Sequence, residues 1–313
     1  MQTHHSWQNL PQPSRGASVA MGNFDGVHLG HQAVIDLART DAPLGVVTFE
    51  PHPRQFFAPD APTFRLMNAE ARANRLAKLG VEHLFELPFD AALAGLTPDE
   101  FARDVLANGL GISHVVVGSD FRFGKGRAGS AADLQALGLK YGFRTTIATL
   151  VQVGDQEISS TAIRNALSEG YPRFAATMLG HWHRIEGEVI HGEKRGRQLG
   201  YPTANMDVKG LHLPKYGVYA VKVEVLTGPH SGAYIGAGSL GVRPMFGVNQ
   251  PNLESFLFDF EGDLYGHHLS VALVDYLRPE LKFDGLQALL DQMKADCEKA
   301  RAILTPDPGS FSG

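Results

Sequence analysis

The sequence predicts two domains of different class: an α/β domain with a parallel sheet, then a small antiparallel β-barrel that ends in a helix. Strand and helix patterns alternate from Ser18 to about Leu150, which is typical of a parallel sheet covered by helices. After about Gly180 the pattern changes to period-two strands separated by Gly, Pro, Asp and Asn clusters. The length of 313 residues also fits two domains.

In the first half, short apolar runs are expected to form strands and amphipathic stretches to form helices. Helices are predicted at 32–39 and 68–79. Another begins at Thr97, which supplies an N-cap, with proline at N1 and Glu100 at N3 for a capping box. The predicted strands are 18–21, 45–49, 83–87, 114–118 and 145–151.

The second half shows three strand patterns, at 218–226, 254–260 and 268–276. A final helix begins near Asp284, and it carries an apolar stripe at helical spacing. Such a stripe indicates core packing, and Cys297 belongs to it, which argues against a catalytic thiol. The stripe consists of Leu286, Leu289, Leu290, Met293 and Cys297.

The composition limits the class of protein. A net charge of -5 provides no basic field for nucleic acid or an anionic membrane surface. A single cysteine excludes an internal disulfide and a cysteine-based zinc site, and no apolar run approaches the ~20 residues of a membrane helix. We therefore expect a cytoplasmic protein with small-molecule partners, and the sequence assigns no oligomeric state. The expected divisions are a flexible lead-in 1–16, domains 17–180 and 181–304, and a flexible tail 305–313.

The most informative stretch is the loop 22–31, which joins the first strand to the first helix. Free N–H groups and the helix dipole at a helix N-terminus favour an anion. Glycines allow close approach of the backbone, and His28 and His31 are spaced so that both can face one ligand. A nucleotide triphosphate is the expected ligand. The alternative is a plain turn with two solvent-facing histidines.

Three further polar segments, 49–53, 117–124 and 158–164, follow predicted strands. Ser160 could cap a helix from Thr161, and Arg164 would add a fixed positive charge one turn later. An ordinary helix cap, and for Asp120 an ordinary turn, are the alternatives. A P-loop is excluded, because five residues separate Gly118 from Gly124 and Gly126 stands where Ser or Thr is needed.

These segments, taken in order, resemble the bacterial FAD synthetases of the nucleotidylyltransferase superfamily, whose H-x-G-H motif reads His28-Leu29-Gly30-His31 here. The resemblance implies a Rossmann-like sheet and an adenylyl transfer in which His28 and His31 are catalytic. It also implies a flavin pocket containing His52, Pro53, Asp120 and Phe121. The ATP and phosphate contacts that it implies are Gly22, Asn23, Phe24, Asp25, Gly30, Ser159, Ser160, Thr161 and Arg164.

Segment 187–205, whose core is Pro202-Thr203-Ala204-Asn205, resembles the riboflavin kinase signature. Its loop 192–200 could wrap a polyphosphate with backbone N–H groups, although a solvated basic hairpin is the alternative. The resemblance implies Mg²⁺ bound by Thr203 and Asn205, and Glu254 as the acceptor of a hydroxyl proton; a surface glutamate is the alternative. The implied ATP contacts are Gly192, Arg195, Gly196, Gly200, Pro202, Thr203 and Asn205.

The second half departs from the riboflavin kinase pattern at four places. The family usually has Arg-Pro at His181-Trp182, Asn-Ile-Gly at 239–241, Thr at Met245, and His at Phe256. These differences concern the rate of a kinase step and the fit of a flavin more than the kind of reaction.

The resemblance as a whole predicts a bifunctional enzyme that makes FMN from riboflavin and ATP in the barrel, and FAD from FMN and ATP in the α/β domain. Both steps would use Mg²⁺, with riboflavin, FMN and FAD as substrates and products. The four departures leave open a monofunctional FMN adenylyltransferase with a barrel that only binds flavin. A nucleotidylyltransferase for pantetheine or nicotinamide phosphate is a third reading, disfavoured by the Pro202–Asn205 segment.

Overall fold

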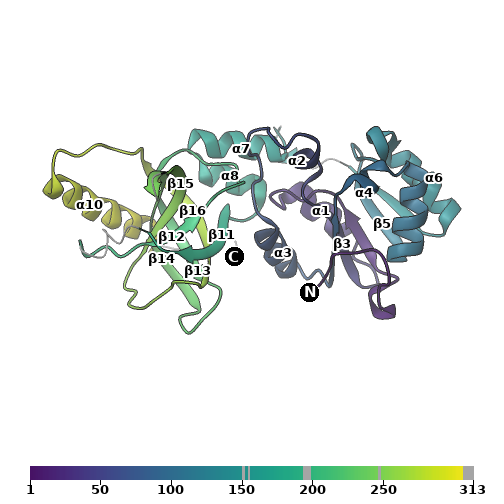
Figure 1. Ribbon diagram of the computed structural model, residues 1–313, viewed down its shortest axis with the longest axis horizontal. Coiled ribbons are helices and arrows are strands. Elements are labelled where there is room, and N and C mark those ends of the chain that lie inside the picture. Colours follow the sequence, from purple (N-terminus) through teal and green to yellow (C-terminus); the bar gives the residue numbers. More distant parts are fainter. Residues whose placement is uncertain (150–151, 154–155, 193–198, 246–247, 306–313) are drawn as a thin grey trace. The chain divides into compact units, whose positions relative to one another are not determined.

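A computed structural model of the chain describes residues 1–313 except 150–151, 154–155, 193–198, 246–247 and 306–313. The chain divides into two compact units, whose segments interleave along the sequence (Figure 1). Unit 1 consists of Met1–Pro62 and Arg72–Ile158, and unit 2 of Thr63–Ala71 and Ser159–Gly313. In the described part of the chain, none of the helices has both the length and the apolar character of a membrane span.

Unit 1 contains a six-stranded sheet in which every pairing is parallel. The prediction of a parallel sheet is confirmed. The last strand ends at Ala148, and the predicted residues 150–151 lie outside the described part. In sheet order, the strands are β1 (Gln2–His4), β4 (His83–Pro88), β3 (Leu44–Glu50), β2 (Ser18–Met21), β5 (His114–Gly118) and β8 (Arg144–Ala148).

Residues 1–16, which were predicted to be a flexible lead-in, instead form a strand and pack against unit 1. β1 adds an edge strand beside β4, and the ring of His4 stacks on Phe85 with centroids 5.1 Å apart. Trp7 packs against the core of unit 1, and the guanidinium of Arg15 donates to the carbonyl of Gly109 at 2.7 Å. The local composition is polar, but pairing with a sheet edge and one aromatic anchor decide the conformation.

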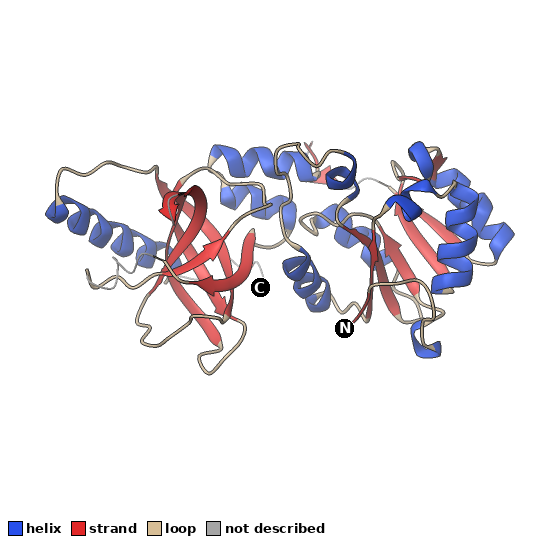
Figure 2. Ribbon diagram, viewed as in Figure 1, coloured by secondary structure: helices blue, strands red, loops and turns tan. Residues whose placement is uncertain are grey.

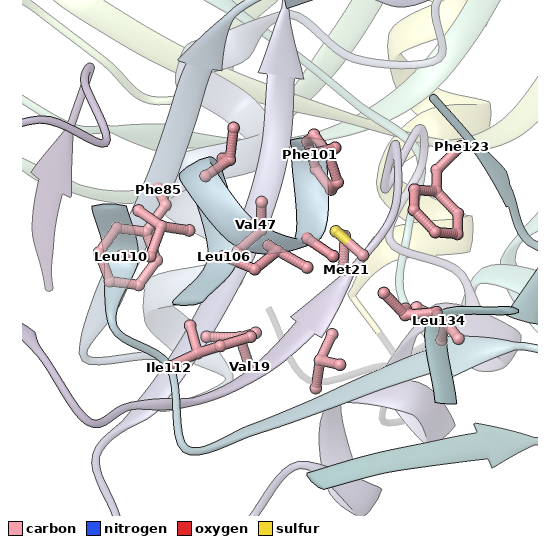
Figure 3. Close-up of a cluster of buried hydrophobic side chains, with 14 of the residues drawn as sticks. Val19, Met21, Val47, Phe85, Phe101, Leu106, Leu110, Ile112, Phe123 and Leu134 are labelled. Atoms are coloured by element: carbon pink, nitrogen blue, oxygen red, sulfur yellow. The ribbon is translucent and has the colours of Figure 1, made fainter. Parts of the chain in front are cut away.

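Helices cover both faces of this sheet. α1 (Leu29–Leu37) packs on β2, β5 and β8, while η2 (Phe101–Leu110) and α6 (Ala131–Tyr141) bury a large apolar cluster on the opposite face. Figure 3 shows this cluster, with side chains from η2 directed at those of the central strands. Its labelled members are Val19, Met21, Val47, Phe85, Phe101, Leu106, Leu110, Ile112, Phe123 and Leu134.

The predicted capping box at Thr97 is confirmed. The backbone N–H of Thr97 donates to Glu100 at 2.9 Å, and the N–H of Glu100 donates to the Thr97 hydroxyl at 3.2 Å. The remaining short elements of unit 1 are η1 (Gln12–Ser14), α2 (Pro53–Phe57), α4 (Ala91–Gly95), α5 (Pro98–Glu100), β6 (Arg122–Phe123), η3 (Lys125–Arg127), β7 (Gly129–Ser130), β9 (Gln152–Val153) and β10 (Gln156–Glu157).

Unit 2 is built on a closed six-stranded antiparallel barrel, as predicted (Figure 2). Inward side chains such as Val221, Leu253 and Leu269 fill its core. The final helix, α10 (Leu286–Leu304), covers part of the outer wall, where Ala300 and Leu304 are buried. In barrel order, the strands are β11 (Arg184–Ile190), β12 (Ala204–Asp207), β15 (Val248–Leu257), β14 (Gly232–Met245), β13 (Gly217–Val225) and β16 (His268–Arg278).

Two helices and a segment from earlier in the chain complete unit 2. The helices are α7 (Ser160–Glu169) and α8 (Pro172–Leu179). Thr63–Ala71 leads into α3 (Ala69–Lys78), and here Asn68 Nδ2 donates to the carbonyl of Glu186 at 2.9 Å. A division into catalytic domains 17–180 and 181–304 stays a prediction.

Candidate functional sites in the two units

The loop after β2 has a fixed and unusual backbone in unit 1. Phe24 and Val27 adopt φ values of 52° and 43°, in the left-handed region that non-glycine residues rarely occupy. Both side chains are buried, at 1% and 0% exposure, so apolar packing holds the loop in this shape. Gly26, between them, has φ of 91°.

His28 is the N-cap of α1, and its ring Nδ1 accepts the backbone N–H of His31 at 3.3 Å. This cap explains why α1 begins at Leu29, earlier than the predicted 32. Because Nδ1 is an acceptor here, the neutral ring carries its proton on Nε2. A Cβ on Gly30 would lie 3.1 Å from this ring, so a glycine here lets the ring lie against the helix start.

The rings of His28 and His31 stack, with centroids 3.6 Å apart and planes 15° from parallel. Burial, and secondly the neighbouring His28, hold the pKa of His31 well below its ordinary value of 6.5. His31 is therefore a neutral hydrogen-bonding group at neutral pH rather than a cation. Its Nδ1 is buried and has no hydrogen-bond partner within the described residues, as expected of a group that meets a ligand.

A buried network holds the beginning of this loop. The carbonyl of Asn23 accepts from the Thr48 hydroxyl at 3.2 Å and from Arg72 Nη1 at 3.5 Å. Arg72 is 1% exposed, and its Nη2 also binds Glu50 at 2.9 Å and Glu86 at 2.6 Å. Arg72 was not predicted as a site residue, although its place four residues before buried Leu76 indicates the inner face of α3.

Near the end of β3, His52 caps α2: its Nδ1 accepts the N–H of Arg54 at 3.0 Å. Pro53 is half-buried behind it, and Asp120 is exposed after β5. A continuous row of phenylalanine rings runs through this region, with neighbouring centroids 5.2–6.5 Å apart. Its members are Phe49, Phe56, Phe57, Phe89, Phe101, Phe121 and Phe123.

The polar segment that follows lies in unit 2, at the start of α7. The N-cap is Ser159, whose Oγ accepts the N–H of Ala162 at 3.2 Å, so the predicted cap at Ser160 is wrong by one residue. The earlier residue caps because it alone has the extended backbone that a cap needs. Arg164 Nη2 donates to the Thr161 hydroxyl at 3.1 Å, and Nη1 donates to the carbonyl of Phe64 at 3.2 Å.

A second polar cluster lies on the barrel of unit 2. Antiparallel pairing places Asn205 of β12 opposite Glu254 of β15. Asn205 is 7% exposed; its Nδ2 donates to the carbonyl of Thr203 at 3.3 Å, and its Oδ1 accepts from Asn252 Nδ2 at 3.0 Å. A Cβ on Gly192 would lie 2.6 Å from Asn205 Nδ2, so any other residue here would displace the Asn205 side chain.

The structure therefore brings Gly192, Thr203, Asn205 and Glu254 together. The spacing of these residues in the sequence does not by itself predict this cluster. Asn252 was missed, although its place two residues before Glu254 puts it on the same strand face. Gly200, with φ of 82°, and exposed Pro202 precede the cluster. The predicted ATP contacts Arg195 and Gly196 lie outside the described residues.

Comparisons with known proteins match both halves of the chain. A family model for FAD synthetase matches residues 10–162, and one for riboflavin kinase matches residues 179–304. A bifunctional riboflavin kinase/FMN adenylyltransferase from Pseudomonas fluorescens is 40% identical, over 98% of this chain and 99% of the relative. The chain belongs to the bifunctional riboflavin kinase/FMN adenylyltransferase family. An Escherichia coli K12 relative of the same name is 38% identical, over 94% of this chain and 95% of its own.

A solved structure supports the arrangement of each part of this riboflavin kinase/FMN adenylyltransferase family member. It is named as a macrolide-efflux protein from Streptococcus pneumoniae and is 32% identical, with a TM-score of 0.79. The match covers 96% of this chain and 98% of the chain in the solved structure. The match of a riboflavin kinase model to the second half favours the bifunctional enzyme over a monofunctional FMN adenylyltransferase. It also favours the bifunctional enzyme over a nucleotidylyltransferase for another substrate.

The departures from the riboflavin kinase pattern are mostly structural. Trp182 is 1% exposed and packs with Ala176 and Ala300, while His181 Nδ1 lies 2.8 Å from the carbonyl of Trp182. Phe256 makes an edge contact with Tyr201 at 5.2 Å. Ser239 of β14 lies opposite Glu254 of the neighbouring strand β15, and the side chain of Met245 is outside the described part.

Cys297 is a packing residue, as its place in the apolar stripe predicts. It contacts the apolar cluster between α10 and the barrel. Burial, and secondly the neighbouring Asp296, raise the pKa of its thiol to about 11. The thiolate needed for nucleophilic chemistry is therefore scarce at neutral pH.

Proposed function

We propose that the two activities of this bifunctional enzyme reside in the two polar clusters, one in each unit. The enzyme phosphorylates riboflavin to FMN and adenylylates FMN to FAD, using ATP in both steps. We assign adenylyl transfer to the loop 22–31 and riboflavin phosphorylation to the cluster around Asn205 and Glu254. The observation that carries this division is that each unit supplies its own set of polar groups at the segment matching the corresponding family.

In adenylyl transfer, a phosphate oxygen of FMN attacks the α-phosphorus of ATP and the bond to pyrophosphate breaks. The attacking phosphate is already an anion, so positioning and charge stabilisation dominate. The Nε2–H of His28 and the neutral ring of His31 would donate to phosphate oxygens. The N-terminus of α1 adds backbone N–H groups and a favourable dipole. Further phosphate contacts in the loop would be Gly22, Asn23, Phe24, Asp25 and Gly30.

The flavin of FMN needs an apolar surface, and the two ends of the phenylalanine row offer aromatic side chains for it. Phe121 is half-buried at one end of the row, and Phe57 at the other is 67% exposed. Aromatic faces of this kind stack on planar rings. We assign the flavin pocket of this step to His52, Pro53, Asp120 and Phe121.

The start of α7, which lies in unit 2, is proposed to bind nucleotide phosphates. Ser159, Ser160 and Thr161 surround the free N–H groups of a ten-residue helix. Arg164 donates to the Thr161 hydroxyl and to the carbonyl of Phe64, so its guanidinium is an oriented cation at this helix start.

In riboflavin phosphorylation, the terminal hydroxyl oxygen attacks the γ-phosphorus of ATP and ADP leaves. Glu254 is half-buried and would accept the hydroxyl proton. Gly192, Gly200 and Pro202, together with Arg195 and Gly196, would contact ATP.

Mg²⁺ fits the barrel cluster by the chemistry of its donors. The amide oxygen of Asn205, the hydroxyl of Thr203 and one carboxylate are hard oxygen ligands, which suit Mg²⁺ shared with a nucleotide. We propose that Thr203 and Asn205 hold the ion, which when bound neutralises phosphate charge. The partners are then riboflavin, FMN and ATP, and this ATP-dependent chemistry suits a cytoplasmic location.

Separation of the two products tests the assignment. Full-length variants are incubated with riboflavin or with FMN, each with Mg-ATP, and the flavins are resolved by chromatography. His28→Ala should form FMN but not FAD. Glu254→Ala and Asn205→Ala should form no FMN from riboflavin, yet adenylylate supplied FMN. Glu261→Ala, an exposed acidic control close to β15, should match the unmodified chain. Equal loss of both steps in His28→Ala would contradict the two-site assignment.

A further inference from the structure

Asn252 joins the two barrel residues to which phosphorylation is assigned. It lies on β15 two residues before Glu254, and it is only 2% exposed. Its Nδ2 donates to Asn205 Oδ1 at 3.0 Å and lies 3.5 Å from Glu254 Oε1. One amide group therefore faces both the proposed metal ligand and the proposed proton acceptor.

The same contacts fix the orientation of the Asn205 amide. Its Nδ2 is held by the carbonyl of Thr203 at 3.3 Å and lies against Gly192, while its Oδ1 is held by Asn252. An amide oxygen has two lone pairs, so Oδ1 can accept from Asn252 and still bind a cation. Without the Asn252 donor, rotation of the Asn205 amide would turn its NH₂ group toward the cation instead.

Buried amides are costly unless their hydrogen bonds are satisfied, so a purely apolar residue would suit this position on β15 if packing were its only role. We propose that Asn252 is a positioning residue for riboflavin phosphorylation: its side-chain amide orients Asn205 Oδ1 for Mg²⁺ and keeps Glu254 beside it. This inference rests on the proposed function of Asn205 and Glu254.

The experiment compares four full-length variants: Asn252→Ala, Asn252→Leu, Asn205→Ala and the Asn252→Ala/Asn205→Ala double variant. Leucine has the same number and branching of side-chain heavy atoms as asparagine but no donor, so it removes the hydrogen bonds without a cavity and serves if the alanine variant fails to fold. Ser255→Ala is the matched control, because Ser255 is the next buried polar residue on β15 and its Oγ has no partner in the described chain.

Residues that orient metal ligands typically change metal affinity or activity by about 10- to 100-fold, and we expect this loss in kcat for FMN formation. The KM for riboflavin should stay within about twofold, and the Mg²⁺ concentration at half-maximal rate should rise. Binding of Mn²⁺ in the presence of ADP, followed by electron paramagnetic resonance, should weaken in the same variants. Adenylylation of supplied FMN and the Ser255→Ala control should be unchanged.

The double variant decides whether Asn252 acts through Asn205. If it does, the double variant should be no slower than Asn205→Ala alone. Independent, additive losses would overturn the proposal, and so would unchanged kinase and Mn²⁺ binding in a folded Asn252→Leu. Retention of kinase activity by Asn205→Ala would instead overturn the assignment of the site itself.

Discussion

Replacing Arg72 with methionine tests whether the buried network holds the loop 22–31. Arg72 is 1% exposed and joins Glu50, Glu86 and the carbonyl of Asn23. Removing one partner of a buried ion pair costs about 3–5 kcal/mol, because the other charge stays buried and unpaired. The Glu50 side chain is 33% exposed and can turn to water, whereas Glu86 is 10% exposed and cannot. We therefore expect a loss near the lower limit, about 3 kcal/mol.

Tryptophan fluorescence can follow this loss in one unit at a time. Trp7 packs in unit 1, and Trp182 is the other of the chain's 2 tryptophans. In a Trp182→Phe background, urea unfolding followed by Trp7 reports unit 1. With a slope of about 2 kcal/mol/M, the midpoint should fall by about 1.5 M. FAD formation should fall more than FMN formation, since the carbonyl of Asn23 loses a donor.

Two further variants show whether charge burial is the cause. Adding Glu86→Gln to Arg72→Met removes the buried negative charge that has lost its Arg72 partner. Much of the lost stability should therefore return. Arg301→Met breaks an ion pair with Asp259 at the surface of unit 2, and its effect on that unit should be far smaller. A midpoint shift below about 0.3 M in Arg72→Met, with FAD formation intact, would show that Arg72 does not hold the loop 22–31.

Three other perturbations follow from the same geometry. Gly30→Ala puts a Cβ 3.1 Å from the His28 ring, so chromatography should show about tenfold slower FAD formation with FMN formation unchanged. Gly192→Ala puts a Cβ 2.6 Å from Asn205 Nδ2 and should lower FMN formation at least about tenfold while sparing adenylylation of FMN. Burial, then His181 and His212, lower the pKa of His183 to about 3. As the pH falls below 6.5, this histidine is therefore protonated in the unfolded state but still neutral in the folded state. Between pH 7 and 5 the free energy of unfolding of unit 2, followed by Trp182 fluorescence, should fall by about 2 kcal/mol, and His183→Leu should remove this slope.

The central strands were predictable because burial on both faces leaves a continuous apolar run. In β3 the segment Val46–Val47 is fully buried, and the same holds for Val115–Val117 in β5. The strand β1 was not predictable, because its polar residues form a strand only by pairing with the edge of β4. The end of β15 was also missed: Asp259 turns the chain with φ of 56°, a conformation that Asp tolerates but does not require.

The candidate sites were predictable where chemistry is encoded locally. His28 and His31 lie in one turn, so their spacing alone places both rings at the helix start. Asn205 and Glu254 meet only through strand register, and the resemblance to riboflavin kinases, not the spacing, brought them together. The predicted cap at Ser160 was one residue late because adjacent serines offer the same hydroxyl, and only backbone geometry chooses between them.

Arg72 and Asn252 were missed for a related reason: each acts on a residue far away in the chain. Their partners Asn23 and Asn205 are 49 and 47 residues distant. The two positioning groups also differ in charge in a way that suits their surroundings. Arg72 is paired with two carboxylates, so it can hold a backbone carbonyl without adding net positive charge. Beside Asn205 a cationic donor would repel the proposed Mg²⁺, whereas the neutral amide of Asn252 supplies a hydrogen bond and adds no charge to the proposed metal site.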